Sequence, residues 1–91
     1  MTQPLAGKQI LIVEDEPVFR SLLHGWLTSL GATTFQAEDG KDALHKMTEV
    51  HPDLMICDIS MPRMNGLELV ETLRNRGEQL PILMISATEN M

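Results

Sequence analysis

The sequence is poor in the residues on which several classes of protein depend. Cys57 is its single cysteine, so neither a disulfide framework nor a thiolate metal site can form within the chain. No stretch approaches the roughly 18 consecutive apolar residues of a membrane-spanning helix. Residues 1–8 lack the basic start and apolar run of a secretory signal. These absences favour a protein of the reducing cytoplasm.

Aromatic residues and positive charge are also scarce. Tyrosine is absent, and the aromatic residues are Phe19, Trp26 and Phe35, which argues against a platform for stacking nucleic-acid bases. Thirteen acidic residues outnumber seven basic ones, and the formal net charge is −6. Nucleic-acid-binding surfaces are basic. We therefore expect no direct nucleic-acid partner, and the lack of an apolar span gives no reason to expect a membrane partner.

What is present is the composition of one small domain. The chain has 91 residues, of which 43% are apolar and 22% charged, so it can form a hydrophobic core. Short apolar runs alternate with stretches whose apolar residues repeat at helical spacing. The runs predict strands over 9–13, 33–37, 54–57 and 82–85, and the stretches predict helices over 18–30, 40–50 and 67–76. The same spacing predicts that Trp26 packs inside the protein and that Leu67 points inward.

Strands that alternate with helices predict a parallel sheet with helices on both faces. Three of the runs are apolar along nearly their whole length, as expected for strands covered on both faces. The run 33–37 is more polar and is expected near an edge. The run 82–85 would form an apolar edge strand, which is prone to association. We therefore expect the 91 residues to be part of a larger domain.

Polar residues follow three of the predicted strands. Glu14 and Asp15 come after the first, Asp58 after the third and Ser86 after the fourth. Ligands of open parallel sheets bind beyond the carboxyl ends of the strands. If the first and third strands are neighbours, three carboxylates converge there, and a hard dication such as Mg²⁺ would relieve their repulsion. Solvated strand ends or helix caps explain the same acids, and spacing alone leaves both explanations open.

Other kinds of phosphate chemistry fit the sequence less well. A dinucleotide site needs a glycine-rich loop after the first strand, where this chain has Glu14, Asp15 and Glu16. Neither G-x-G-x-x-G nor a Walker lysine motif occurs. Phosphatases of the haloacid dehalogenase type carry a second acid two residues after the nucleophile, where this chain has Ser60. A metal-dependent phosphotransferase is therefore disfavoured.

Taken together, the motifs resemble the receiver domain of bacterial two-component response regulators. The resemblance covers nearly the whole chain, and its pieces occur in the family's order. The matching pieces are Ile10 to Glu16 (ILIVEDE), Asp39-Gly40, Pro52-Asp53-Leu54, the run Asp58 to Gly66 (DISMPRMNG) and Ser86-Ala87. The N-terminus and the stretch 86–91 (SATENM) resemble, more narrowly, members that act as adaptors in the proteolysis of a sigma factor.

The resemblance implies a fold and a set of roles. The fold is α/β and flavodoxin-like (CheY-like), a three-layer α/β/α arrangement with a parallel sheet in strand order 2-1-3-4. Asp58 would accept a phosphoryl group from a histidine kinase or a small phosphodonor. Asp15 and Asp58 would bind Mg²⁺ together with the backbone carbonyl of Ser60, and Glu14 would bind it directly or through water. Ser86 would be the switch hydroxyl that turns toward the phosphoryl group.

The chain also departs from the family pattern. Glu14 stands where many members have Asp, and Asn65 replaces a common Asp. The family domain continues through a fifth strand that carries a lysine, and through two further helices. Residues 1–91 therefore correspond to a partial receiver domain, for which we expect self-association through the exposed fourth strand. The resemblance implies a signalling module and not an enzyme; the alternative is an interaction module that works without phosphorylation.

Overall fold

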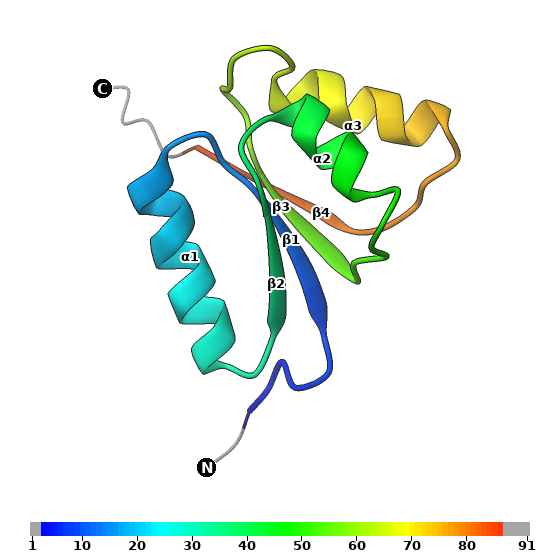
Figure 1. Cartoon of the computed structure of the whole chain (residues 1–91). Coiled ribbons are helices and arrows are strands. Elements are labelled where there is room, and N and C mark those ends of the chain that lie inside the picture. The colour runs from blue at the N-terminus through cyan, green and yellow to red at the C-terminus, as the bar shows by residue number, and fades with distance from the viewer. Residues whose placement is uncertain (1–2, 87–91) are drawn as a thin grey trace.

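A computed structural model of the chain describes residues 3–86 (Figure 1). The elements follow in the order β1 (Gln9–Val13), α1 (Pro17–Ser29), β2 (Thr33–Ala37), α2 (Gly40–Lys46), β3 (Leu54–Asp58), α3 (Gly66–Asn75) and β4 (Ile82–Ile85). The strands form one parallel sheet in the order β2-β1-β3-β4. The α/β class, the strand order and the edge position of β2 are as predicted. Residues 87–91, which carry part of the sequence resemblance, lie outside the described residues.

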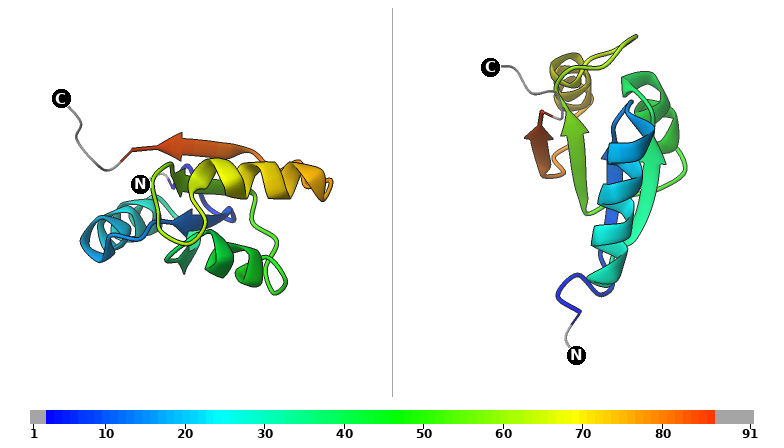
Figure 2. Two further views of the ribbon diagram at one scale, coloured as in Figure 1. Left: turned by 90° about the horizontal axis from the view of Figure 1, so that it is seen from above. Right: turned by 90° about the vertical axis from the view of Figure 1, so that its left-hand side faces the viewer.

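The sheet is the middle of three layers, because β1 and β3 are apolar on both faces. Figure 2 shows α1 on one side of the sheet and α2 with α3 on the other. Successive strand residues point to opposite faces, so Leu11 and Val13 join the core beneath α2 and α3, whereas Ile10 and Ile12 join the core beneath α1. Cys57 is buried in the first of these cores, as a small apolar side chain would be. No helix among residues 3–86 is long and apolar enough to cross a bilayer.

Two helices bury a narrower stripe than their sequences suggest. On α1 the inward side chains include Leu23 and Leu27, whereas Val18, Leu22 and Trp26 are 67%, 64% and 60% exposed. The predicted packing of Trp26 is therefore wrong. Leu67 is 63% exposed, so its inward placement is wrong as well. The apolar face of α1 is wider than the part of the helix that contacts the sheet. On α3 the leucines that are buried are Leu69 and Leu73.

The end of α2 also differs from the prediction, because the helix stops at Lys46 and not at Val50. The chain leaves the helix in tight turns: the Thr48 backbone N–H donates to the His45 carbonyl at 3.0 Å, and the Thr48 hydroxyl donates to the same oxygen at 2.7 Å. A threonine hydroxyl that bonds to a nearby carbonyl competes with helix continuation. The start of α2 is as expected, since Asp39 accepts a hydrogen bond from the Asp42 backbone N–H at 2.8 Å.

Candidate metal centre

The carboxyl ends of β1 and β3 bring three acidic side chains into one cluster. One oxygen each of Glu14, Asp15 and Asp58 lies within 4.8 Å of the others. The pairing of β1 with β3 causes this, because Val13 is in register with Cys57 and the next residue of each strand is acidic. The three acids that the sequence predicts to converge are therefore together. They open into a cavity of about 260 Å³, which is lined by Glu14, Asp15, Glu16, Asp58, Ser60, Met61 and Pro62.

Glu14 is the most unusual member of the cluster. Its side chain is fully buried, and its Oε2 accepts a hydrogen bond from the Glu16 backbone N–H at 3.0 Å. Among the residues that the structure describes, its Oε1 is the buried side-chain atom that lacks a hydrogen-bond partner. Buried polar atoms are nearly always satisfied. A buried carboxylate oxygen without a donor is what a site for a cation requires.

The electrostatics of Glu14 agree with this geometry. Burial has the largest effect and disfavours the charged form of Glu14. The Glu16 backbone N–H favours the charged form, and the neighbouring Asp58 disfavours it. Together these effects raise the pKa of Glu14 from 4.5 to about 7. Burial also raises the pKa of the Cys57 thiol to about 12, with the charges of Asp58 and Glu14 adding to the effect. Cys57 therefore stays a neutral thiol beside the cluster.

Asp58 and Ser60 line the cavity at the end of β3. Asp58 is nearly buried, and its Oδ1 accepts a hydrogen bond from the Ser60 backbone N–H at 3.2 Å. The Ile59 backbone N–H donates to the Ile85 carbonyl at 2.9 Å, which ties the chain after Asp58 to β4. Further along, Asn65 and Glu68 form a capping box at the start of α3. Asn65 thus serves as the helix cap that its residue type favours.

The predicted switch hydroxyl, Ser86, is the residue that follows β4. It is exposed, and it is not among the described residues that line the cavity. Glu16 also lines the cavity, a site role that was not predicted for it. It caps α1 as well, by accepting hydrogen bonds from the backbone N–H groups of Val18 and Phe19. Its place before a helix with Pro17 in the first turn is the signal that identifies the cap.

The residues present fit a magnesium ion. Mg²⁺ takes oxygen ligands and uses one or two carboxylates, with waters or phosphoryl oxygens filling its other positions. The cluster offers carboxylate oxygens from the ends of β1 and β3 to one open cavity. The buried Oε1 of Glu14 lies among them, and no described residue donates a hydrogen bond to it. A divalent cation would relieve the repulsion among the acids and supply the missing partner.

Comparisons with known proteins agree with the fold and the motifs. The family model for the response regulator receiver domain matches residues 10–91. Over its whole length the chain is 71% identical to the Regulator of RpoS of Escherichia coli strain K12, and it spans 27% of the length of that relative.

Solved structures of similar fold include two bacterial signalling proteins. The response regulator TrrA of Thermotoga maritima, in complex with Mg²⁺ and BeF, matches with a TM-score of 0.83 and 38% identity, over 90% of this chain and 71% of that one. The chemotaxis protein CheY4 of Vibrio cholerae matches with a TM-score of 0.84 and 31% identity, over 93% of this chain and 72% of that one.

Proposed function

The chain belongs to the response regulator receiver domain family, and from that premise we propose that it is a phosphoacceptor module whose Asp58 is phosphorylated in a Mg²⁺-dependent reaction. The observation that carries the proposal is the buried oxygen of Glu14, beside Asp15 and Asp58, that has no hydrogen-bond partner within residues 3–86. Acids placed together without a cation would only cost stability. A module of this kind receives a signal and passes it on; it does not turn over a substrate as an enzyme does.

The proposed reaction is a single phosphoryl transfer. A carboxylate oxygen of Asp58 attacks the phosphorus of the donor, and an acyl phosphate bond forms. The bond from phosphorus to the leaving group breaks, which is a P–N bond for a phosphohistidine and a P–O bond for a small acyl phosphate, and the electron pair leaves with that group. The Ser60 backbone N–H already donates to Asp58 Oδ1 at 3.2 Å, so it holds the carboxylate in a fixed orientation.

Three acids and one carbonyl would hold the metal. Asp15 and Asp58 would offer carboxylate oxygens, Ser60 its backbone carbonyl, and Glu14 would bind directly or through a water. When bound, the ion offsets the repulsion between the attacking carboxylate and the anionic phosphoryl group. Ser86 is proposed as the switch hydroxyl that turns toward the product. In this role the hydroxyl would meet a phosphoryl oxygen once Asp58 is modified.

We infer the partners from the family and from the similarity to the Regulator of RpoS. A histidine kinase or a small phosphodonor would supply the phosphoryl group. Because the chain is 71% identical to the Regulator of RpoS, we propose that it comes from an RssB-like adaptor of the cytoplasm, which regulates the proteolysis of sigma factor RpoS by ClpXP. The chain spans 27% of that relative, so RpoS and ClpXP are proposed as partners of the whole adaptor.

The proposal is tested with acetyl phosphate and Mg²⁺, followed by intact-mass measurement under conditions that preserve acyl phosphates. The unchanged chain is expected to gain one phosphoryl group and Asp58→Ala none. Asp53→Ala is the matched control, because Asp53 is an exposed aspartate at the opposite end of β3. Labelling that persists in Asp58→Ala contradicts the proposal. The reaction is repeated on a chain that also carries the family's fifth strand and its lysine, where an absence of labelling contradicts it too.

A second candidate is an interaction module that works without phosphorylation. The observation in its favour is the exposed apolar row on α1, formed by Val18, Leu22 and Trp26 at a spacing of one helical turn each. It predicts that partner binding is unchanged in Asp58→Ala and unaffected by beryllofluoride with Mg²⁺. Dependence of partner binding on Asp58 excludes this candidate.

We also propose that the chain self-associates along β4. This strand pairs with β3 on one side, and Leu83 on it is 53% exposed. An apolar edge strand offers unpaired backbone groups to a second copy. Sedimentation of a pure monomer at high protein concentration contradicts this proposal.

A further inference from the structure

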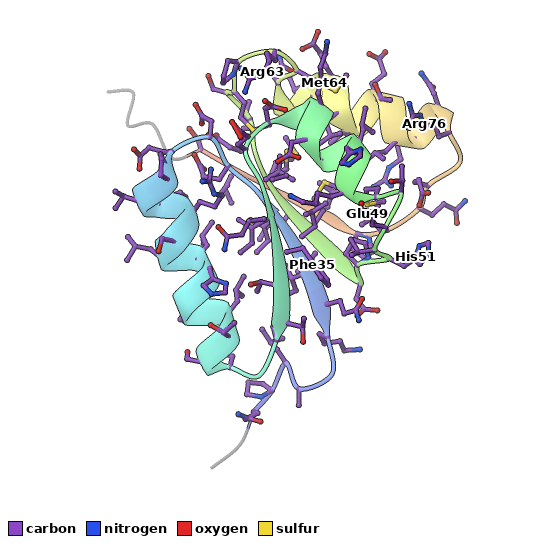
Figure 3. All side chains as sticks on the ribbon, viewed as in Figure 1. Phe35, Glu49, His51, Arg63, Met64 and Arg76 are labelled. Atoms are coloured by element: carbon purple, nitrogen blue, oxygen red, sulfur yellow. The ribbon has the colours of Figure 1, made fainter. Side chains whose placement is uncertain are left out.

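The loop 59–65 forms one wall of the metal cavity and contacts a separate part of the chain. Ser60, Met61 and Pro62 line the cavity, whereas Arg63 and Met64 lie against the start of α2. Figure 3 shows Arg63 and Met64 at the end of the sheet where α2 begins. The same short loop therefore connects the cavity with the turn between β2 and α2, and the contact there fixes how the loop is placed.

Arg63 makes the strongest of these contacts. Its Nε donates to Asp39 Oδ2 at 2.5 Å, and its Nη2 contacts the same oxygen. Nη2 also lies 3.4 Å from Glu38 Oε1. Asp39 is only 3% exposed, and its other oxygen accepts the capping hydrogen bond from Asp42. The guanidinium thus joins the loop to a carboxylate that is itself fixed at the start of α2.

The backbone at this contact is tightly constrained. Arg63 has a φ of 66°, and it is the one residue other than glycine with a positive φ in the described part of the chain. A positive φ costs free energy in a residue that has a side chain, so the contacts around Arg63 must stabilise this backbone conformation. Met64 accepts a hydrogen bond from the Gly40 backbone N–H at 3.2 Å, and a Cβ on Gly40 would lie 2.6 Å from Met64 Cγ.

We propose that Arg63 is a positioning residue for the metal cavity: its ion pair with Asp39 holds the loop 59–65 so that Ser60 stays in the cavity wall beside the acid cluster. The inference rests on the proposed function of the cavity. Electrostatic repulsion alone predicts that Arg63 weakens Mg²⁺ binding, because a cation at the rim of a site repels Mg²⁺. Any benefit that Arg63 gives to metal binding must therefore come from the geometry it imposes.

The ionisation of Asp39 supports a permanent ion pair. Burial acts to raise the pKa of Asp39, but the Asp42 backbone N–H and the Arg63 guanidinium outweigh it and hold this pKa below 3.8. Asp39 is therefore charged throughout the neutral range. Its charge is compensated by Arg63 at one oxygen and by the helix N-terminus at the other.

The test is the affinity for Mg²⁺ alone, measured by isothermal titration calorimetry at pH 8. Arg63→Gln is expected to weaken Mg²⁺ binding by about tenfold, the lower end for residues that orient metal ligands. Arg76→Gln is the matched control, because Arg76 is an exposed arginine after α3 and its loss changes the net charge equally. The control is expected to bind Mg²⁺ as tightly as the unchanged chain or slightly more tightly.

A double variant separates positioning from folding. Arg63→Gln alone leaves the buried Asp39 charge without its partner, which destabilises the folded chain. Asp39→Asn together with Arg63→Gln removes both charges and keeps a capping oxygen. If the ion pair acts as one unit, the double variant loses the same tenfold as Arg63→Gln, because effects within one interaction are not additive. Urea unfolding verifies that each titrated variant is folded.

Two results overturn the inference, and they are distinguishable. If folded Arg63→Gln or the double variant binds Mg²⁺ as tightly as the unchanged chain, Arg63 has no positioning role although the metal site stands. If the unchanged chain binds no Mg²⁺, the proposed function of the cavity fails and the inference fails with it.

Discussion

At the amino end of the sheet, the Asp53 carboxylate accepts a hydrogen bond from the Gln9 backbone N–H at 2.8 Å and remains exposed to solvent. At the carboxyl end, Glu14 is fully buried, and its Oε1 has no partner among residues 3–86. Asp53 joins β1 to the chain before β3 at no cost in desolvation. Glu14 costs free energy when it is charged, because it is out of water and beside Asp58. The same functional group is structural at one end of the sheet and poised for a cation at the other.

The largest effect is expected from a substitution that disturbs the backbone at Asp58, at the carboxyl end of the sheet. Gly66→Ala places a Cβ 2.3 Å from the Asp58 carbonyl and 3.0 Å from Ile59 Cα, and backbone atoms cannot yield cheaply. We expect a loss of about 3 kcal/mol in the free energy of unfolding, together with weaker Mg²⁺ binding. Urea denaturation measures the loss of stability. Gly25→Ala is the control, since a Cβ there meets nothing within 4 Å and a helical alanine should stabilise by about 0.5–1 kcal/mol. Equal stabilities of the two variants would contradict the close approach.

A second prediction concerns a substitution that removes the buried charge and keeps the shape of the side chain. Glu14→Gln resembles the protonated side chain, so at pH 8 the metal-free chain should become more stable by about 3 kcal/mol, as expected for a pKa raised from 4.5 to about 7. Its affinity for Mg²⁺ should fall, because a charged oxygen is lost. Thermal and urea unfolding with and without Mg²⁺ measure both effects. Glu71→Gln, on the exposed side of α3, should change neither. A destabilised Glu14→Gln would mean that the charge of Glu14 is already compensated.

The pH dependence sharpens the comparison further. Because the folded-state pKa of Glu14 is raised from 4.5 to about 7, its contribution to stability is full below pH 4.5 and is lost as the pH rises through 7. Asp39 acts in the opposite sense, but its lowered pKa confines the change to pH values below 3.8. Mg²⁺ should therefore bind about tenfold more tightly per pH unit up to pH 7 and level off above it. Calorimetry from pH 5.5 to 8 tests this, and a flat profile would show that Glu14 is ionised throughout.

The smallest expected effect lies at the amino end of the sheet. Asp53→Ala removes the acceptor of the Gln9 N–H, which then turns to water, so the loss should be no more than about 1 kcal/mol. Mg²⁺ affinity should be unchanged, as measured by the same titration. A marked loss of metal binding in this variant would show that the two ends of the sheet are coupled, and the comparison between them would no longer hold.

The sequence predicted the acid cluster because the rule that produces it is simple. Parallel strands end at one edge of a sheet, so acids that follow β1 and β3 meet when these strands are neighbours. The bounds of β1, β2 and β4 were also predictable from their apolar runs. The wrong placements of Trp26 and Leu67 have one cause: helical spacing identifies an apolar stripe but not how much of it a sheet covers.

The ion pair of Arg63 with Asp39 was beyond reach of the sequence. It joins two loops 24 residues apart, and it depends on a positive φ at Arg63 that no periodic pattern encodes. No motif or spacing in the sequence assigns a partner to Arg63. Asp39 precedes the predicted helix 40–50 and is of a residue type that caps helices, but a capping residue gives no sign that its second oxygen holds an arginine. Loop-to-loop contacts of this kind are set by tertiary structure alone.

The central claim is tested most directly by a crystal structure of the chain grown with Mg²⁺ and beryllofluoride, a mimic of the phosphoryl group. The account predicts beryllofluoride on a carboxylate oxygen of Asp58, and one metal ion about 2.1 Å from oxygens of Asp15, Asp58 and the Ser60 carbonyl. A well-ordered structure with Mg²⁺ bound elsewhere, or with beryllofluoride on a residue other than Asp58, would contradict it.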